Sequence, residues 1–161
     1  MKLLLISDTH GKTNGLENII DKYKDEVSAV FHMGDNSSDV ESILGAICPN
    51  VPAYLVAGNC DKPGRYPDEK IVEINGKNIL VLHGHFVSVK SSLNLLTSYA
   101  QGMGVDAVFF GHTHKPYSCI HEGIFFFNPG SYSIPQIDTN ASYGIVEIDS
   151  NGVFSGEIIK K

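Results

Sequence analysis

The sequence predicts an α/β fold in which mixed β-sheets form a sandwich covered by helices. Apolar runs of strand length alternate with amphipathic helical patterns through the first part of the chain, as far as Ala57. This alternation is typical of parallel strands that are joined by helices. After Phe110 the helical pattern ends and only short apolar runs follow. We therefore expect an antiparallel second part.

The expected elements follow the chain in order. Short apolar runs predict buried strands at Lys2–Ser7, Ala29–Met33, Ala53–Ala57, Asn78–Leu82 and Asp106–Phe110. Apolar residues at three- and four-residue spacing predict helices at Asn14–Tyr23, Ser38–Ile47 and Ser88–Met103. Further short strands are expected at Ser118–Ile120, Ile124–Asn128, Tyr143–Ile148 and Val153–Ile159. The segment Cys60–Glu69 is rich in Pro, Gly and charge, and is expected to be an exposed loop.

Length and composition favour one globular domain over residues 1–161. Apolar residues make up 42% of the chain and charged residues 19%, a mixture that is ordinary for a globular fold. The net charge is −6 and no basic run is present, so we expect no extended nucleic-acid surface. A small phosphorylated substrate can still be attracted by a local positive centre, such as a bound metal.

Cysteine use and the first residues bear on the compartment. The three cysteines, Cys48, Cys60 and Cys119, are widely spaced and form no CxxC pair, which fits a reducing cytosol. We expect Cys48 and Cys119 to be small buried apolar residues. The apolar start is too short for a signal peptide, and no segment approaches the roughly 18 apolar residues of a membrane span. The protein is therefore expected to be cytoplasmic, with its oligomeric state open and a homo-oligomer included.

Polar side chains follow each of the five buried strand runs. The five segments are Asp8-Thr9-His10-Gly11, Gly34-Asp35, Gly58-Asn59-Cys60-Asp61, His83-Gly84-His85 and Gly111-His112-Thr113-His114. Ligands of open α/β sheets bind beyond the carboxyl ends of the strands. Because the same residue types recur at every strand end, we expect them to meet in one site.

The residue types at these strand ends are those of a transition-metal site. Imidazole, carboxylate and amide oxygen together suit Mn²⁺, Fe²⁺, Ni²⁺ or Zn²⁺. Mg²⁺ usually prefers oxygen ligands and retained waters, so it is the weaker candidate. Seven such ligands are too many for one ion, but they suffice for two ions that share a carboxylate.

The motifs DTH, GD, GNCD, HGH and GHTH, in this order, resemble those of the calcineurin-like metallophosphoesterase family. The likeness is greatest to its small single-domain phosphodiesterases, and it extends from Asp8 to about Ser131, at the end of a further family loop that begins at Asn128. The resemblance implies a double β-sandwich flanked by helices. It also implies two divalent metal ions, with manganese favoured and nickel, iron or zinc as alternatives. By motif, the first metal would be bound by Asp8, His10 and His114, the second by Asn59, His83 and His112, and Asp35 would bridge them.

The activity that this resemblance implies is hydrolysis of a phosphate ester, with a diester favoured, by in-line attack of a metal-bridging hydroxide. Two divalent ions bring four positive charges, and two aspartates and one hydroxide remove three, so the centre stays positive. Two alternatives remain open. One is a phosphomonoesterase, and the other is a non-catalytic scaffold protein of the same fold, such as a small subunit of the retromer coat. A scaffold can lose a metal ligand without penalty, so the complete set of seven favours an enzyme.

The catalytic residues expected beside the metals are Asp35, Asn59, Cys60 and His85. Much of the family has His where this chain has Cys60, and that His assists the leaving group. A thiol with a reference pKa near 8.5 is a poorer general acid than imidazolium, so we expect Cys60 to contribute little to protonation of the leaving group. His85 is either a supporting residue of the centre or a packed histidine.

Four other polar residues are assigned structural or solvent-exposed roles outside the site. His32 and His121 are expected to be structural. Lys62 and Arg65 lie close to the motif in sequence, but a solvated loop is the favoured interpretation for both.

Overall fold

The computed structural model describes all residues from 1 to 161 and contains two five-stranded mixed sheets. The first sheet has the order β10 (Phe154–Lys160), β9 (Ser142–Ile148), β1 (Lys2–Ile6), β2 (Ala29–His32) and β3 (Ala53–Leu55). The second has the order β4 (Glu69–Ile74), β5 (Lys77–Leu82), β6 (Ala107–Phe110), β8 (Ile124–Asn128) and β7 (Tyr117–His121). The helices are α1 (Leu16–Tyr23), α2 (Ser37–Ile47), α3 (Asn94–Met103) and the short 3₁₀ helix η1 (His85–Val87).

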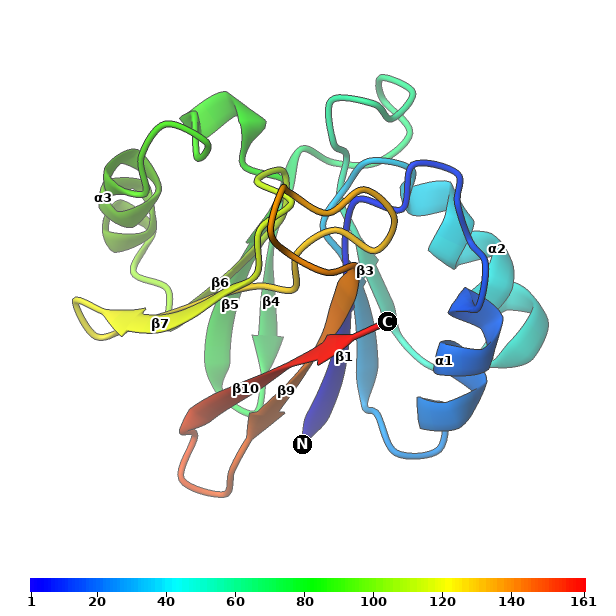
Figure 1. Ribbon diagram of the computed structural model, residues 1–161. Coiled ribbons are helices and arrows are strands. Elements are labelled where there is room, and N and C mark those ends of the chain that lie inside the picture. Colours follow the sequence, from blue (N-terminus) through cyan, green and yellow to red (C-terminus); the bar gives the residue numbers. More distant parts are fainter.

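The two sheets pack face to face, and helices cover both outer faces. Figure 1 shows α1 and α2 on the outer side of the first sheet and α3 on the outer side of the second. The predicted double β-sandwich flanked by helices is therefore confirmed. The longest helix, α2, has 11 residues. None of the helices combines the length and apolar character that crossing a lipid bilayer requires.

The side chains of β1 point alternately into two hydrophobic cores. Leu3 and Leu5 point into the cluster of 16 buried residues between the sheets. Leu4 and Ile6 point the other way, into the 14-residue cluster under α1 and α2. Strands that are buried on both faces read as continuous apolar runs, which is why LLLI shows no alternation of polarity. Full burial of each such side chain contributes roughly 1.5–3 kcal/mol before the entropy cost.

Parallel pairing brings the motif-bearing strand ends to one edge of the sandwich. β1 pairs in parallel with β2, and β2 with β3, as the alternating pattern predicted. In the other sheet β5 pairs in parallel with β6. In Figure 1 the loops that follow these strands lie together at the top of the view. The carboxyl ends of both sheets thus supply side chains to the same region.

The expectation of a wholly antiparallel second part is wrong for β8. This strand pairs antiparallel with β7 but parallel with β6. All five of its residues are buried, whereas β7 is largely exposed. The Glu122-Gly123 turn that joins them has positive φ at both residues (51° and 78°), the conformation of a tight hairpin. The apolar strand thus takes the interior position beside β6, and the exposed strand takes the edge.

One strand, β4, was absent from the expected elements, because its sequence EKIVEI carries three charged residues. It lies at the edge of the second sheet and pairs antiparallel with β5. Charged residues are common on edge strands, where one side faces water. The Asn75-Gly76 turn before β5 was the available signal, since Asn-Gly between two strands indicates a hairpin.

Two further expectations need correction. The helix expected over Ser88–Met103 begins only at Asn94. Ser88 has a left-handed φ of 52°, so the preceding segment forms turns instead of helix. Cys119 was expected to be buried but is exposed on β7, because an edge strand leaves its residues open to solvent. Cys48 is buried, as expected.

Candidate metal centre

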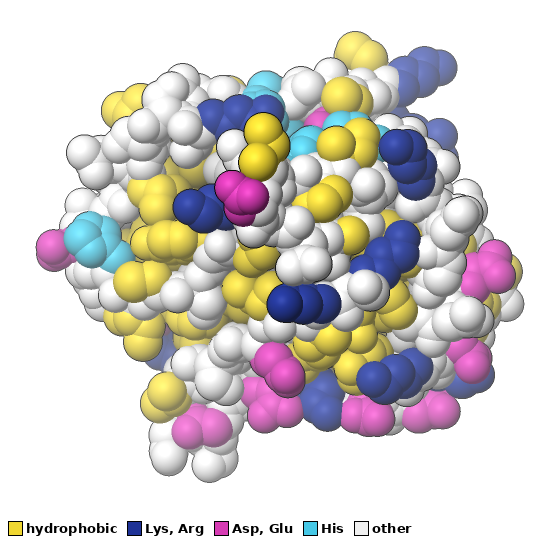
Figure 2. All heavy atoms as spheres, viewed as in Figure 1, with side chains coloured by type: hydrophobic (Ala, Val, Ile, Leu, Met, Phe, Trp, Pro, Cys, Tyr) yellow, Lys and Arg dark blue, Asp and Glu magenta, His cyan; other side chains and the backbone are white.

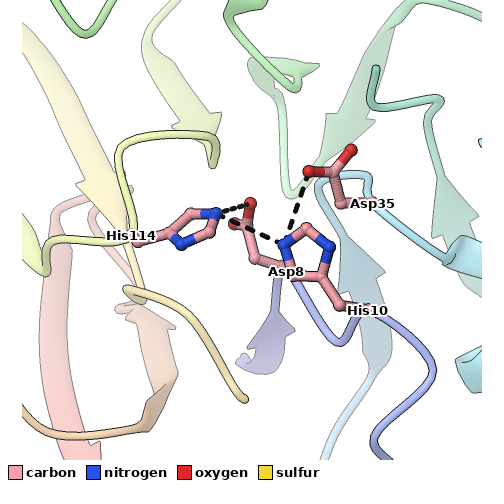
Figure 3. Close-up of side chains that lie close together, drawn as sticks. All are labelled: Asp8, His10, Asp35 and His114. Carbon is pink, nitrogen blue, oxygen red and sulfur yellow. Dashed lines mark hydrogen bonds and ion pairs between the residues drawn. The ribbon is translucent and has the colours of Figure 1, made fainter. Parts of the chain in front are cut away.

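Four side chains from distant parts of the chain converge at the carboxyl ends of the strands. Asp8 and His10 follow β1, Asp35 follows β2, and His114 follows β6. One ligand atom from each of these residues lies within 4.8 Å of those of the others. Figure 3 shows the two imidazole rings and the two carboxylates directed at one another. This arrangement suits a metal ion that binds nitrogen and oxygen together.

A second group of expected ligands lies on the other side of Asp35. Nε2 of His83 lies 3.2 Å from Oδ1 of Asn59 and 3.0 Å from Nδ1 of His112. His83 is completely buried, while Asn59 lies on the exposed turn after β3. The structure thus brings together all seven residues that the motifs singled out as metal ligands.

One oxygen of Asp35 faces both groups. Its Oδ2 atom lies 3.6 Å from Nε2 of His10 and 3.5 Å from Nε2 of His83. The other oxygen, Oδ1, accepts a hydrogen bond of 2.8 Å from the backbone N–H of Cys60. Because that bond fixes the carboxylate, Oδ2 is held between the two groups of ligands.

The hydrogen bonds of two histidines show that their free nitrogens carry lone pairs. Nδ1 of His114 lies 2.6 Å from the carbonyl oxygen of Ile134, and Nδ1 of His83 lies 2.6 Å from that of Met33. A carbonyl oxygen only accepts hydrogen bonds, so both Nδ1 atoms carry the proton. In a neutral ring Nε2 is then an acceptor. Histidines that bind metals commonly have this arrangement, with the second nitrogen donating to a carbonyl.

These lone pairs point at other electron-rich atoms. Nε2 of His114 lies 3.1 Å from Oδ1 of Asp8 and 3.3 Å from Nε2 of His10. Asp8 is completely buried, and its Oδ1 atom has no aligned hydrogen-bond donor. A buried carboxylate oxygen without a donor is costly, and a facing lone pair adds repulsion. Only a cation between these atoms, either a proton or a metal ion, relieves both. The residues therefore fit divalent metals.

The pKa values of these residues follow from the same contacts. Burial by itself raises the pKa of Asp8, but the contact with His114 and the charge of His83 outweigh it, so the pKa lies below its ordinary value. The pKa of His114 is raised by the contact with Asp8, against the opposing effect of burial. Burial, then His83, and then Lys90 lower the pKa of His112 to about 4. The contact between His114 and Asp8 thus shifts their two pKa values in opposite directions and favours a charged pair over a neutral one.

Five of the seven candidate ligand residues have a left-handed backbone. Their φ angles are 56° for Asp8, 47° for His10, 62° for Asp35, 65° for His112 and 57° for His114. Non-glycine residues seldom adopt such angles, which cost on the order of 1 kcal/mol or more each. Strain of this kind concentrates at functional sites, where the surrounding structure maintains it. The sharp turns direct these side chains into the centre immediately after each strand.

Glycines beside the ligands leave no room for a side chain. A Cβ atom on Gly34 would lie 2.7 Å from Nδ1 of His83, and one on Gly58 would lie 2.9 Å from the carboxylate carbon of Asp35. A Cβ atom on Gly111 would lie 2.9 Å from Oδ2 of Asp8 and still closer to Ser7 Oγ. The glycine in each of these motifs is therefore required by close packing against a ligand.

Asp61 supports the centre, a role that the sequence analysis did not assign. Its Oδ2 atom accepts hydrogen bonds of 2.8 Å from the backbone N–H groups of both Asp35 and Gly58, and its Oδ1 atom accepts one of 2.9 Å from Ser37. Asp61 thus ties the turn after β2 to the turn after β3. Its position two residues after Asn59 was the only signal in the sequence.

The loop after β8 is hydrogen-bonded to the turn that carries Asp8. Ser131 Oγ and Ser133 Oγ donate hydrogen bonds to the backbone oxygen of Asp8 across 2.9 and 3.1 Å. Asn128 donates to the backbone oxygen of Gly111 across 2.9 Å. The Asn128–Ser131 segment, which carries the further family loop, therefore lies beside the candidate centre.

Cys60 and His85 lie beside the centre without joining the ligand clusters. The Sγ atom of Cys60 is 3.4 Å from Nδ2 of Asn59, and burial followed by the charge of Asp35 raises the pKa of the thiol. Cys60 therefore carries its proton at neutral pH. The ring of His85 lies 5.5 Å from that of His83, and its buried Nδ1 atom has no hydrogen-bond partner. Burial, and then His83, lower its pKa, so this ring is neutral.

The residues that were expected to be structural or solvent-exposed lie outside the clusters of candidate metal ligands. His32 is buried, its Nδ1 atom is 2.9 Å from Ser37 Oγ, and burial lowers its pKa to about 4. His121 is exposed at the end of β7. Arg65 pairs with Glu41 across 2.8 Å on the surface, and Lys62 is exposed.

A stacked pair of mixed sheets with an Asp–His cluster at its strand ends defines an α/β sandwich metalloprotein. The family model described as "Calcineurin-like phosphoesterase superfamily domain" matches residues 1–151 of this chain. The chain belongs to this superfamily of metallophosphoesterases, as its motifs indicated. Members act with divalent metals, and the cluster described above is the candidate site for them.

Individual relatives support the assignment. The chain is 34% identical over 151 residues to the "Probable metallophosphoesterase YsnB" of Bacillus subtilis, covering 94% of this chain and 86% of the relative. A Streptococcus pneumoniae protein described as a "predicted phosphoesterase" superposes with a TM-score of 0.82 at 29% identity, over 99% of this chain and 88% of that one. Vps29 of Entamoeba histolytica, solved with zinc, shares the fold, with a TM-score of 0.77 at 22% identity over 99% and 98% of the two chains.

Proposed function

We propose that this protein is a dinuclear metal-dependent phosphodiesterase. The first divalent ion would be bound by Asp8, His10 and His114, the second by Asn59, His83 and His112, and Asp35 would bridge them. The observation that carries this proposal is the position of Asp35 Oδ2, which lies 3.6 Å from a nitrogen of the first group and 3.5 Å from one of the second. Such ions lower the pKa of water to roughly 7 and neutralise charge on phosphoryl oxygens.

The residues of the chain contribute position and charge. Hydrogen bonds of Nδ1 to carbonyl oxygens orient His83 and His114, so that each Nε2 atom is available as a ligand. The backbone N–H of Cys60 and the Asp61 carboxylate fix the Asp35 turn. Preorganised ligands of this kind need little rearrangement as charge develops during the reaction.

Charge and space both favour a diester over a monoester. A centre with two divalent ions, two carboxylates and one hydroxide has a net charge of +1, which matches the single negative charge of a phosphodiester. A monoester carries about −1.5 to −2 at neutral pH. A groove of about 720 Å³ beside His114 leaves room for the second ester group, which only a diester has. The neutral Cys60 thiol offers little acid catalysis, which favours substrates whose leaving groups depart readily.

The competing proposal is a scaffold with the same fold. The Vps29 structure with zinc shows that this fold can bind a metal in a protein whose name is not that of a phosphoesterase. Metal content alone therefore does not discriminate between an enzyme and a scaffold. The discriminating experiment is turnover. The protein, loaded with Mn²⁺, is screened against phosphomonoesters, linear diesters and cyclic nucleotides. Hydrolysis of diesters ahead of monoesters supports the proposal, and no turnover of any ester contradicts it.

We also propose manganese as the working metal and the cytosol as the compartment. The mixed nitrogen and oxygen ligands support manganese, with nickel, iron and zinc as the alternatives. The three cysteines are all free in the structure, which suits a reducing compartment. Comparing turnover with each metal at equal occupancy tests the first point.

A further inference from the structure

A groove opens directly beside the metal centre, with a volume of about 720 Å³. Its walls come from the turns before α3, from the segment Thr113–Tyr117 after β6, and from Pro135–Ile137 in the loop before β9. His114 belongs both to the ligand cluster and to the lining of the groove. A molecule bound at the metals would therefore extend into this groove. Its volume lies within the range of roughly 300–1,000 Å³ that is usual for sites of small organic ligands.

The charge of the groove is opposite to that of the protein. Its 12 lining residues include Lys90 and Lys115 but no Asp or Glu, although the whole chain has a net charge of −6. Both lysines are exposed, and neither takes part in a salt bridge. Figure 2 shows Lys or Arg side chains next to histidine side chains near the top of this face. Two unpaired ammonium groups beside a metal site suit an anionic group on the ligand.

The remaining wall of the groove is largely apolar. Its apolar lining includes the half-buried Leu93 and the exposed Ile137, whereas the lining residues Val89 and Phe110 are buried. Ile137 is 87% exposed, so its side chain is open to a ligand in the groove. Exposed apolar side chains that line a groove indicate an apolar surface on the ligand. The groove thus combines an apolar or aromatic contact with two positive charges.

We propose that this groove binds the ester group beyond the scissile phosphate, and that the substrate is a phosphodiester in which an apolar or aromatic ester group carries a second anionic group. The inference rests on the proposed phosphodiesterase activity and specifies its substrate class. Lys90 and Lys115 bind the second anion, which is a carboxylate or a phosphate, and the apolar wall with Ile137 contacts the body of the group. Lys90 and Lys115 are therefore specificity residues.

The test compares two phosphodiesters that differ only in the second anion. Diphenyl phosphate and 4-carboxyphenyl phenyl phosphate are titrated into the Mn²⁺-loaded protein by calorimetry. An ion pair at the surface contributes at most about 1 kcal/mol, so we expect each lysine to tighten binding of the carboxylate by up to about five-fold. The double variant Lys90→Gln/Lys115→Gln should lose this preference, measured as the ratio of the two affinities, even where its affinity for both anionic probes falls. The variant Lys90→Arg/Lys115→Arg should retain the preference, because it preserves both charges.

Two controls separate the groove from general effects. Lys24→Gln removes one positive charge from the surface near the end of α1, where Lys24 pairs only with exposed Asp21, and should leave the preference unchanged. Ile137→Ser should weaken binding of both probes alike, by roughly three-fold, because it removes apolar contact only.

The possible results distinguish this inference from the proposed function. Equal affinity of the wild-type protein for the two probes overturns the inference, and so does a preference that persists in Lys90→Gln/Lys115→Gln. Hydrolysis of bis(4-nitrophenyl) phosphate tests the proposed function separately. A protein that lacks this hydrolysis but shows the lysine-dependent preference is a binding protein whose groove is correctly assigned. A protein that hydrolyses the diester without the preference is an enzyme whose groove is wrongly assigned.

Discussion

The backbone N–H of Cys60 donates a hydrogen bond to Oδ1 of Asp35 across 2.8 Å. The contribution of position 60 to the centre thus comes from the main chain and does not require a particular side chain. The thiol lies 3.4 Å from Asn59 Nδ2, and its pKa is raised by burial and by Asp35. A substitution at this position can therefore change leaving-group chemistry without disturbing the bridge.

Cys60→Ala should change turnover little, because the backbone hydrogen bond remains. Cys60→His supplies a proton donor, and should accelerate alkyl diesters more than nitrophenyl diesters, which have good leaving groups. Rates for a series of aryl and alkyl phosphodiesters with the three proteins check this. A large and uniform loss in Cys60→Ala with metal content intact would reveal a function of the thiol. A uniform loss in Cys60→His would mean that the ring disturbs the second metal.

Asp35→Asn should reduce turnover by about 10²-fold or more relative to wild type. This loss should be greater than that in Asp8→Asn. Asp35 Oδ2 faces both ligand groups, whereas Asp8 belongs to the first group alone. Loss of the Asp35 charge therefore affects both metals. Turnover at saturating Mn²⁺ decides between the variants, with bound metal measured on the same samples. Equal losses, or a greater loss in Asp8→Asn, would contradict the bridging assignment.

Elemental analysis after saturation with Mn²⁺ and removal of free metal should give about two ions per chain. The seven ligands form two groups that share Asp35, which is the arrangement of two-metal sites. Binding to the folded state alone should also raise the midpoint of thermal unfolding, since metal at 100 times its Kd contributes about 2.7 kcal/mol. Addition of a chelator should reverse the shift. A ratio near zero in a folded sample would refute the site.

Gly58→Ala should destabilise the protein by roughly 1–3 kcal/mol and remove most activity, because the new methyl group would collide with Asp35. Gly45→Ala is the matched control. Position 45 lies inside α2, and a Cβ atom there meets nothing within 4 Å. Alanine should stabilise this helix by up to about 1 kcal/mol. Thermal unfolding and diester turnover of both variants are the measurements, and a harmless Gly58→Ala would show that the turn after β3 adapts freely.

Metal affinity should fall on acidification through roughly pH 6–7 because protons compete for the histidine ligands. Asp8 raises the pKa of His114, whereas the pKa of His112 is lowered to about 4. His114 should therefore be protonated first. In the metal-free protein, protonated His114 stabilises the folded state. This contribution is fully present below the pKa of the unfolded chain, near 6.5, and it disappears as the pH rises through the higher pKa of the folded state.

Histidine NMR titration of the metal-free protein resolves the order of protonation, and Mn²⁺ titrations across the same pH range give the affinity. Activity that is flat from roughly pH 5 to 8 would be inconsistent with histidine ligation. So would protonation of His112 before His114.

Most of the fold, and the residues that converge at the candidate metal centre, were predictable from local sequence patterns. Apolar runs of four to six residues identified the strands β1, β2, β5 and β6, and the polar residues directly after them form the clusters. Strand partners are set by contacts distant in sequence, so the parallel pairing of β8 with β6 was missed. The supporting role of Asp61 was also missed, because it depends on three backbone N–H groups from two separate turns.

The left-handed backbone of the metal-ligand residues has an evolutionary consequence. Glycine at position 8, 10 or 112 would relax an unfavourable φ angle and remove a ligand in the same step. Without bound metal, such a variant should fold at least as well as its parent wherever lost contacts are few. A duplicated gene that is no longer selected for catalysis could therefore lose its chemistry through mutations that folding does not oppose. One scaffold can in this way give rise to both hydrolases and proteins whose task is only to bind.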